Sequence, residues 1–126
     1  MERVTGIGGV FLRARDPVAL AAWYGEHLGL DIEESWHGAV VPSAGGESVW
    51  AAFKADTTYF GRLEQQTMVN YRVEDLDAMV AQLRAAGIEV EEPQETENGR
   101  FTWAEDPEGN RFELYQPPPS QSPKSV

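Results

Sequence analysis

Cysteine is absent from the 126 residues, which excludes disulfides and thiolate chemistry. No apolar run is long enough to cross a bilayer, so we expect no membrane partner. Basic residues are scarce, with 10 Lys and Arg against 21 Asp and Glu, and the net charge of −11 repels nucleic acid. An acidic chain attracts cationic ligands, although acidity also serves solubility. Together these features favour a cytoplasmic protein.

An internal repeat is the main positive feature. At an offset of 59 residues, counted from 10 to 69, the residues that coincide are Val10 with Val69, Arg13 with Arg72, Asp16 with Asp75, Ala19 with Ala78 and Ala22 with Ala81. After a one-residue deletion, Gly29 coincides with Gly87, and Glu33-Glu34 with Glu91-Glu92. A repeat of this period indicates two copies of one supersecondary unit, and a space between two copies is the natural place for a ligand.

The first copy predicts a strand, a helix and two further strands. Alternating residues over Thr5–Arg15 are typical of a strand. Asp16-Pro17 suits the start of a helix, and Gly29 suits its end. Two more strands are expected at Ile32–Val41 and Val49–Lys54, around the turn-rich Pro42–Gly46.

The second copy repeats this order after a linker over residues 55–66. We expect a strand at Thr67–Val73, a helix from Asp75 to Gly87, a strand at Ile88–Glu92, and a hairpin of Phe101–Glu105 and Arg111–Tyr115. The polar segment Glu95–Arg100 reads as either a mobile rim or an ordinary surface loop. The sequence thus predicts one domain over residues 1–117, with modules at about 5–56 and 66–117, and a disordered tail over 118–126.

Three motifs, taken in order, resemble the vicinal oxygen chelate superfamily, which includes glyoxalase I, bleomycin-resistance proteins and extradiol dioxygenases. The terminal hairpin is carried by Asp106-Pro107-Glu108-Gly109-Asn110-Arg111-Phe112-Glu113-Leu114. Trp23-Tyr24 with Leu28-Gly29-Leu30 resembles the first helix and turn, and Val73–Ala78 with Ala85–Ile88 resembles the second strand and helix. The resemblance implies an α+β fold: paired βαβββ modules forming an open, cupped mixed sheet of about eight strands with helices outside. It also implies a homodimer with its ligand in the cup.

Enzymes of this superfamily commonly hold a divalent metal in the cup, through four strand positions. On this chain those positions fall on Gly9, Ala51, Met68 and Glu113. Only Glu113 offers a competent donor, whereas a protein metal site usually needs three or more. His27 on the first helix and His37 near the second strand are too far apart to compensate. We therefore predict no metal and no cofactor.

Alternation along the strands predicts which side chains line the cup. The predicted ligand-binding residues are Phe11, Arg13, Phe53, Asn70, Arg72, Glu113 and Tyr115. Arg13 and Arg72 are repeat partners, and either they hold Glu113 in a structural ion pair or one guanidinium is left for a ligand. In the second case Glu113 is a candidate catalytic base. Trp50 and Trp103 either pack in the core or form a stacking wall.

The resemblance and the missing metal donors favour a metal-free protein that sequesters a small aromatic or cationic molecule, as bleomycin-resistance proteins do. A lyase, isomerase or dioxygenase with a non-standard site at Glu113 is the alternative, so enzymatic activity stays open. A third interpretation is a structural or regulatory module that uses the fold for dimerization. The aromatic linker Thr57–Gly61 would lie in a dimer interface or over the cup entrance.

Overall fold

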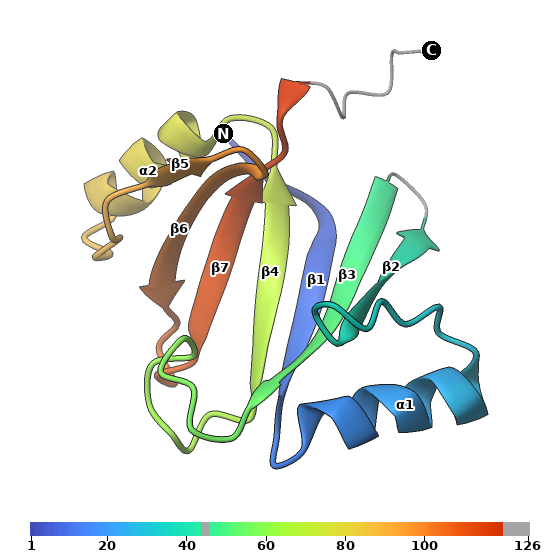
Figure 1. Ribbon diagram of the computed structural model, residues 1–126. Coiled ribbons are helices and arrows are strands. Elements are labelled where there is room, and N and C mark those ends of the chain that lie inside the picture. Colours follow the sequence, from blue (N-terminus) through green and yellow to red (C-terminus); the bar gives the residue numbers. More distant parts are fainter. Residues whose placement is uncertain (44–45, 120–126) are drawn as a thin grey trace. The chain divides into compact units, whose positions relative to one another are not determined.

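The computed structural model describes residues 1–43 and 46–119, in two compact units (Figure 1). The first unit is Gly8–Val69. The second unit is Met1–Ile7 together with the chain from Asn70 onward. Most of the predicted tail and the centre of the predicted turn at 42–46 lie outside the described residues.

The first unit contains one helix and a three-stranded arrangement. Its elements are β1 (Val4–Ala14, shared with the second unit), α1 (Pro17–Leu28), β2 (Gly38–Ser43) and β3 (Gly46–Lys54). Strand β3 pairs in parallel with β1 and antiparallel with β2, which gives the order β2-β3-β1. Helix α1 packs on β3 through Tyr24 and Trp50, whose ring centroids are 4.5 Å apart.

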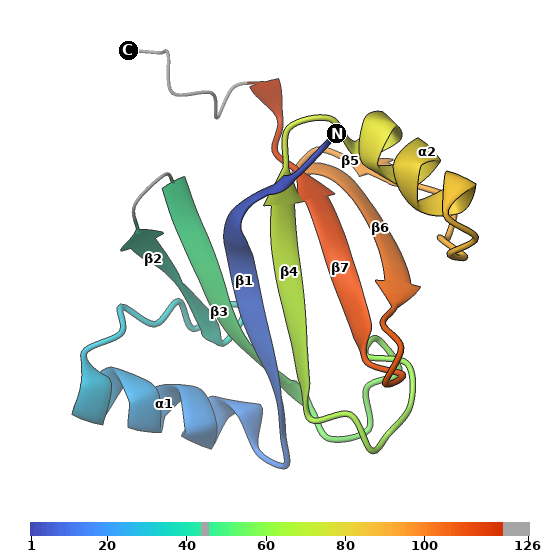
Figure 2. The same cartoon turned by 180° about the vertical axis from the view of Figure 1, so that it is seen from behind.

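The second unit has four strands and one helix, seen from the other side in Figure 2. Its elements are β4 (Thr67–Val73, whose first three residues belong to the first unit), α2 (Leu76–Ala85), β5 (Gln94–Thr96), β6 (Gly99–Glu105) and β7 (Arg111–Gln116). The order is β4-β7-β6-β5, with β4 parallel to β7 and the other pairs antiparallel. No helix in the described part of the chain is long and apolar enough to span a membrane.

Both helices begin as the sequence predicts. The Asp16 carboxylate accepts a hydrogen bond of 3.0 Å from the backbone N–H of Ala19, and Asp75 does the same for Ala78 at 3.0 Å. These bonds satisfy N–H groups that have no partner inside a helix. Helix α1 ends at Gly29, whose φ of 73° is left-handed and therefore suits glycine.

The strand register confirms that the two copies align. Phe11 lies opposite Ala51 and Arg13 opposite Phe53 in β1 and β3. In β4 and β7, Asn70 lies opposite Glu113 and Arg72 opposite Tyr115. Each of these β1 residues thus has its counterpart in β4 at the repeat offset of 59, and each of these β3 residues has its counterpart in β7 at an offset of 62. The predicted α+β architecture is confirmed, whereas the enclosed cup stays a prediction.

One face of the second unit's strands is covered by α2. The core there consists of Val73, Leu76, Met79, Val80, Val90, Ala104 and Leu114. Because neighbouring side chains of a strand point to opposite faces, residues that alternate with Leu114 and Ala104 lie on the other face. Glu113 and Trp103 therefore share a face that α2 does not cover.

Two predicted strands differ from the structure: Ile32–Val41 is a strand only from Gly38, where β2 begins, and Ile88–Glu92 is not a strand. The described chain has seven strands rather than about eight, because the first copy has β1, β2 and β3 where a βαβββ module has four strands. Residues 34–37 turn instead of extending, because the N–H groups of Trp36 and His37 both donate to the Glu33 carbonyl. His37 adopts a φ of 55°, and only a single bridge joins Glu33 to Gly38.

The second wrong strand is Ile88–Glu92. Glu91 alone reaches the edge of β6, donating its N–H to the Trp103 carbonyl at 3.0 Å and accepting from the Thr102 hydroxyl at 2.6 Å. The strand that pairs with this edge of β6 is β5, whose last two residues belong to the segment Glu95–Arg100, expected to be a rim or a surface loop.

Candidate functional site

Glu113 is the centre of a buried polar group in the second unit. Its side chain is 1% exposed. The Nδ2 of Asn70 donates to Oε1 at 2.6 Å, and the indole Nε1 of Trp103 donates to Oε2 at 2.8 Å. The three residues lie side by side on neighbouring strands, since Glu113 is opposite both Asn70 in β4 and Trp103 in β6. Two N–H donors thus offset part of the cost of burying the carboxylate.

Asn70 contributes a second feature to this group. The residue is 3% exposed, and its Oδ1 has no hydrogen-bond partner among the described residues. Buried polar atoms of native proteins nearly always have a partner in the protein, in ordered water or in a ligand. The Asn70 amide oxygen is therefore an acceptor still available beside Glu113.

Arg72 is anchored to the chain's first residues rather than pointing into open space. Its Nη1 donates to the Ile7 carbonyl at 3.1 Å, and a side chain at Gly6 would collide with its guanidinium. Beside it, Tyr115 stacks on Phe101 with ring centroids 4.8 Å apart and planes 18° from parallel. Both rings are only half-buried, so they form a partly accessible aromatic ledge.

The first unit's predicted ligand-binding residues make mainly structural contacts. Phe11 and Phe53 pack at 5.3 Å between centroids. The Arg13 guanidinium donates four hydrogen bonds to the carbonyl oxygens of Ala55, Thr57, Arg62 and Gln65, and lies 5.1 Å above the ring of Phe60. Arg13 therefore holds the linker over residues 55–66.

The aromatic linker packs within its own unit. Phe60 is fully buried and its ring lies 5.3 Å from that of Phe53, on which Tyr59 also stacks at 5.6 Å. The linker thus covers the Phe53 side of the sheet with side chains of the same unit. Whether Tyr59 also contributes to a dimer or to a cup entrance stays a prediction.

The donor chemistry does not fit a divalent metal at the family's ligand positions. Gly9 and Ala51 have no side-chain donor, and Met68 is a fully buried thioether. Both oxygens of Glu113 already accept hydrogen bonds. Across residues 1–43 and 46–119, no three His, Cys, Asp or Glu side chains are grouped as a metal site requires. His27 is half-exposed beside Glu26, at 3.8 Å, and His37 lies in a turn.

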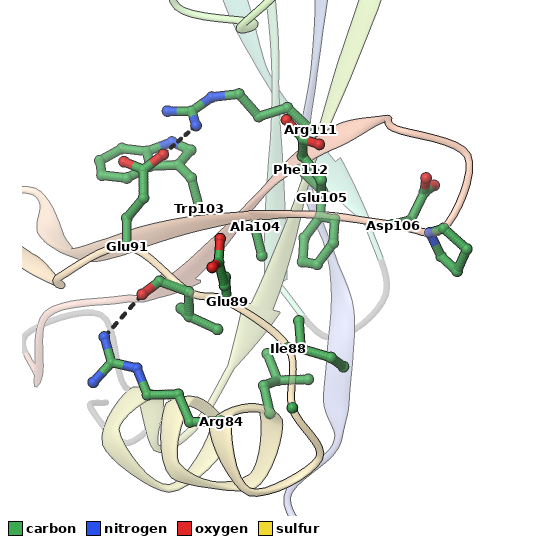
Figure 3. A pocket seen from close by; sticks show the side chains of 14 residues that line it. Arg84, Ile88, Glu89, Glu91, Trp103, Ala104, Glu105, Asp106, Arg111 and Phe112 are labelled. Atoms are coloured by element: carbon green, nitrogen blue, oxygen red, sulfur yellow. Dashed lines mark hydrogen bonds and ion pairs between the residues drawn. The ribbon is translucent and has the colours of Figure 1, made fainter.

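A separate depression of about 1080 Å³ lies in the second unit, between the end of α2 and the β6–β7 hairpin (Figure 3). Ile88, Leu83 and Phe112 give it apolar walls. Trp103 is the one residue of the buried group that reaches it, and none of the predicted ligand-binding residues does. Arg111 lies over the Trp103 ring at 5.4 Å and is ion-paired with Glu91.

Sequence reasoning placed Asn70, Arg72, Glu113 and Tyr115 on one face but missed the donor role of Trp103. The signal was present, because pairing the two hairpin strands puts Trp103 directly opposite Glu113. The predicted ion pair of Arg13 with Glu113 overlooked the carbonyl oxygens of the linker, which take four N–H groups of Arg13.

Comparison with known proteins identifies the fold. The sequence profile of the glyoxalase-like domain matches residues 9–115. No protein in the curated set matches. Among solved structures, methylmalonyl-CoA epimerase from Mycobacterium tuberculosis is 22% identical with a TM-score of 0.68, and the match covers 93% of this chain and 91% of that one.

Two further solved structures show the range of similar proteins. A methylmalonyl-CoA epimerase in complex with methylmalonyl-CoA and NH4+ has a TM-score of 0.71 at 20% identity, covering 96% of this chain and all of that one. A glyoxalase/bleomycin resistance protein/dioxygenase superfamily member from Vibrio splendidus 12B01 has a TM-score of 0.58 at 14% identity, with 92% and 99% covered. At such identities the likeness shows the fold and not the reaction.

Proposed function

Because the chain belongs to the family of glyoxalase-like domains, we propose that it binds a small molecule without the help of a metal ion. The site is the face of β4, β7 and β6 that carries Asn70, Glu113 and Trp103. The protein sequesters its ligand there rather than transforming it, in the manner of a bleomycin-resistance protein.

The main support for this proposal is that both carboxylate oxygens of Glu113 accept hydrogen bonds from the protein. In a metal site the carboxylate oxygens coordinate the ion, and other protein groups support them from behind. Here Asn70 and Trp103 donate directly to the two oxygens, at 2.6 and 2.8 Å. The other positions at which the family supplies ligands hold glycine, alanine and methionine. The carboxylate is thus fixed by the protein's own N–H groups.

The surroundings of Glu113 support a site for an organic ligand. The Phe101–Tyr115 ledge supplies flat apolar surface, while Asn70 supplies a polar atom that has no hydrogen-bond partner in the described part of the chain. A few placed polar groups in mostly apolar surroundings are typical of small-molecule sites. The net charge of −11 favours ligands that carry positive charge.

Titration calorimetry on chelator-treated protein tests the proposal, with a panel of cationic and aromatic antibiotics and simpler aromatic amines, acids and alcohols. We expect saturable binding of at least one class, and weaker binding to Glu113→Gln. Glu92→Gln is the matched control, since that side chain is 88% exposed. No saturable binding across the panel contradicts the proposal, as does stoichiometric Zn, Ni, Mn or Fe in the purified protein.

A lyase or isomerase acting through Glu113 is the second candidate function. The observation that favours it is the orientation of the carboxylate, which Asn70 and Trp103 hold in one position as a general base requires. Methylmalonyl-CoA belongs among the trial substrates, because similar solved structures are methylmalonyl-CoA epimerases. This function predicts turnover that Glu113→Gln abolishes while the variant still folds. A bound metal would instead bring a metal-dependent lyase, isomerase or dioxygenase to the front.

A further inference from the structure

We infer that the ligand is an arylalkyl amine, whose ammonium group donates a hydrogen bond to the Oδ1 of Asn70 and whose ring rests on the Phe101–Tyr115 ledge. This inference rests on the proposed function and specifies the class of molecule that the site accepts.

The orientation of the Asn70 amide is determined by its neighbour. A carboxylate oxygen only accepts hydrogen bonds, so the amide nitrogen must face Glu113 and the amide oxygen must face away from it. The Oδ1 is then an acceptor held in place by the 2.6 Å bond on the other end of the same amide. Because it has no partner among the described residues, an incoming molecule satisfies it by donating, not by accepting.

The Glu113 carboxylate next to the Asn70 amide determines which charge the ligand's donor group should carry. Glu113 is 1% exposed, so its carboxylate acts through little intervening water. An amide that donates to a carboxylate also carries more negative charge on its own oxygen, which strengthens the hydrogen bond that the oxygen accepts. A protonated amine therefore suits this acceptor better than a neutral N–H or O–H group.

The size of the donor follows from burial. Asn70 is 3% exposed, so any group that reaches its amide oxygen must be compact. A primary ammonium has three N–H donors and a small radius, whereas an N-methylated ammonium is bulkier and loses donors. The site should therefore discriminate between amines that have the same charge and different degrees of methylation.

The aromatic part of the ligand follows from the strand geometry. Tyr115 is two residues beyond Glu113 on β7, so it points to the same face about 7 Å farther along. Phe101 stacks on it from β6 and extends the flat surface. Since both rings are half-buried, a ligand ring can pack against them. A short alkyl spacer then joins that ring to an amine at Asn70.

The experiment compares two ligands of equal charge by titration calorimetry. The probes are phenylpropylamine and its N,N,N-trimethyl derivative, which keeps the positive charge and the ring but has no N–H donor. We expect the primary amine to bind about tenfold to a hundredfold more tightly. Because the protein is unchanged in this comparison, no folding defect can produce the difference.

A variant then locates the effect at Asn70. Asn70→Leu keeps the volume but removes both the acceptor and the hydrogen bond that Asn70 donates to Glu113, so its fold is first checked by circular dichroism. The folded variant should bind the two probes equally while still binding the trimethyl derivative. Asn98→Leu, on an exposed turn, is the control and should keep the preference for the primary amine. In the wild-type protein, the side-chain NH2 resonance of Asn70 should also shift on addition of the primary amine.

The possible outcomes separate this inference from the proposed function. Equal affinity for the two probes, or a preference that survives in Asn70→Leu, overturns the inference. So does a crystal structure of the complex in which a water molecule, and not the ligand, bonds to Oδ1. If neither amine binds but aromatic acids or alcohols do, the inference fails while the proposed function survives. If no amine, acid or alcohol binds and no antibiotic of the panel binds either, both the inference and the proposed function are wrong.

Discussion

The indole N–H of Trp103 donates a hydrogen bond of 2.8 Å to Glu113, and the same indole borders the depression beside α2. Trp103 thus contacts both the buried Glu113 carboxylate and the depression. Arg111, which also borders the depression, lies over the Trp103 ring at 5.4 Å and is ion-paired with Glu91. Losing the indole N–H leaves the Glu113 carboxylate with one donor fewer in a place that water scarcely reaches.

Trp103→Phe tests the weight of this hydrogen bond. The variant keeps an aromatic ring but removes the N–H, and we expect the free energy of unfolding to fall by about 1–3 kcal/mol, plus a smaller packing loss. Urea denaturation measures it. Trp23→Phe is the matched control, because Trp23 is 51% exposed and should change stability by less than about 0.5 kcal/mol. Equal effects of the two substitutions would contradict the role given to the indole N–H.

Much of the fold follows from local signals in the sequence. Asp16 and Asp75 can cap helices wherever those helices lie, and Gly29 suits a left-handed residue without reference to any other part of the chain. The internal repeat predicts more than these local signals do, because two copies of one unit should pair their strands in equivalent registers. That is why alternation along the aligned strands could place Asn70 and Glu113 on the same face.

The errors arise where partners distant in sequence decide the structure. Ile88–Glu92 alternates like a strand, but a strand needs an edge to pair with, and β5 takes that place on β6. Arg13 alternates correctly on β1, yet its charge is used by linker carbonyls whose position no pattern reveals. Hydrogen bonds between residues distant in sequence depend on the tertiary structure, which the periodicity of apolar residues along the chain does not predict.

Arg13→Met should release the linker. The four hydrogen bonds of the guanidinium end on carbonyl oxygens between Ala55 and Gln65, including that of Arg62. We expect a loss of roughly 2–4 kcal/mol in the free energy of unfolding and several-fold faster tryptic cleavage after Arg62. Mass spectrometry of the fragments identifies the site. Arg15→Met, which changes an exposed arginine, should leave that cleavage rate unchanged. An unchanged rate in Arg13→Met would show that other contacts hold the linker.

Two glycines with positive φ should respond differently to alanine. Gly29 has a φ of 73° and open space where a Cβ would stand, so Gly29→Ala should cost only the backbone strain, about 1 kcal/mol. Gly99 has a φ of 127°, and a Cβ there would collide with the Gln116 carbonyl and the Tyr115 ring. Gly99→Ala should therefore cost more, about 2–4 kcal/mol, and shift Tyr115. Thermal denaturation and the aromatic NMR signals measure both effects, and equal costs would contradict the predicted collision.

Asp106 should make stability depend on pH in the acid range. The backbone N–H of Asn110 donates to its carboxylate, and with the Asn110 side chain this lowers the pKa of Asp106 below the usual carboxyl value. A lowered pKa means that the folded state favours the ionised form, so its contribution is complete above the pKa of the unfolded chain, about 3.9, and is lost as the pH falls through the folded pKa.

The measurement is the difference in free energy of unfolding between the wild type and Asp106→Ala, taken from urea denaturation at several pH values. The difference should be constant near neutral pH and shrink as the pH falls below about 4, because both proteins then lack the ionised carboxylate at this turn. Glu108→Ala removes an exposed charge from the same turn and controls for the change in net charge. A difference that stays the same from pH 7 into the acid range would show that the hydrogen bonds to Asp106 do not depend on its ionisation.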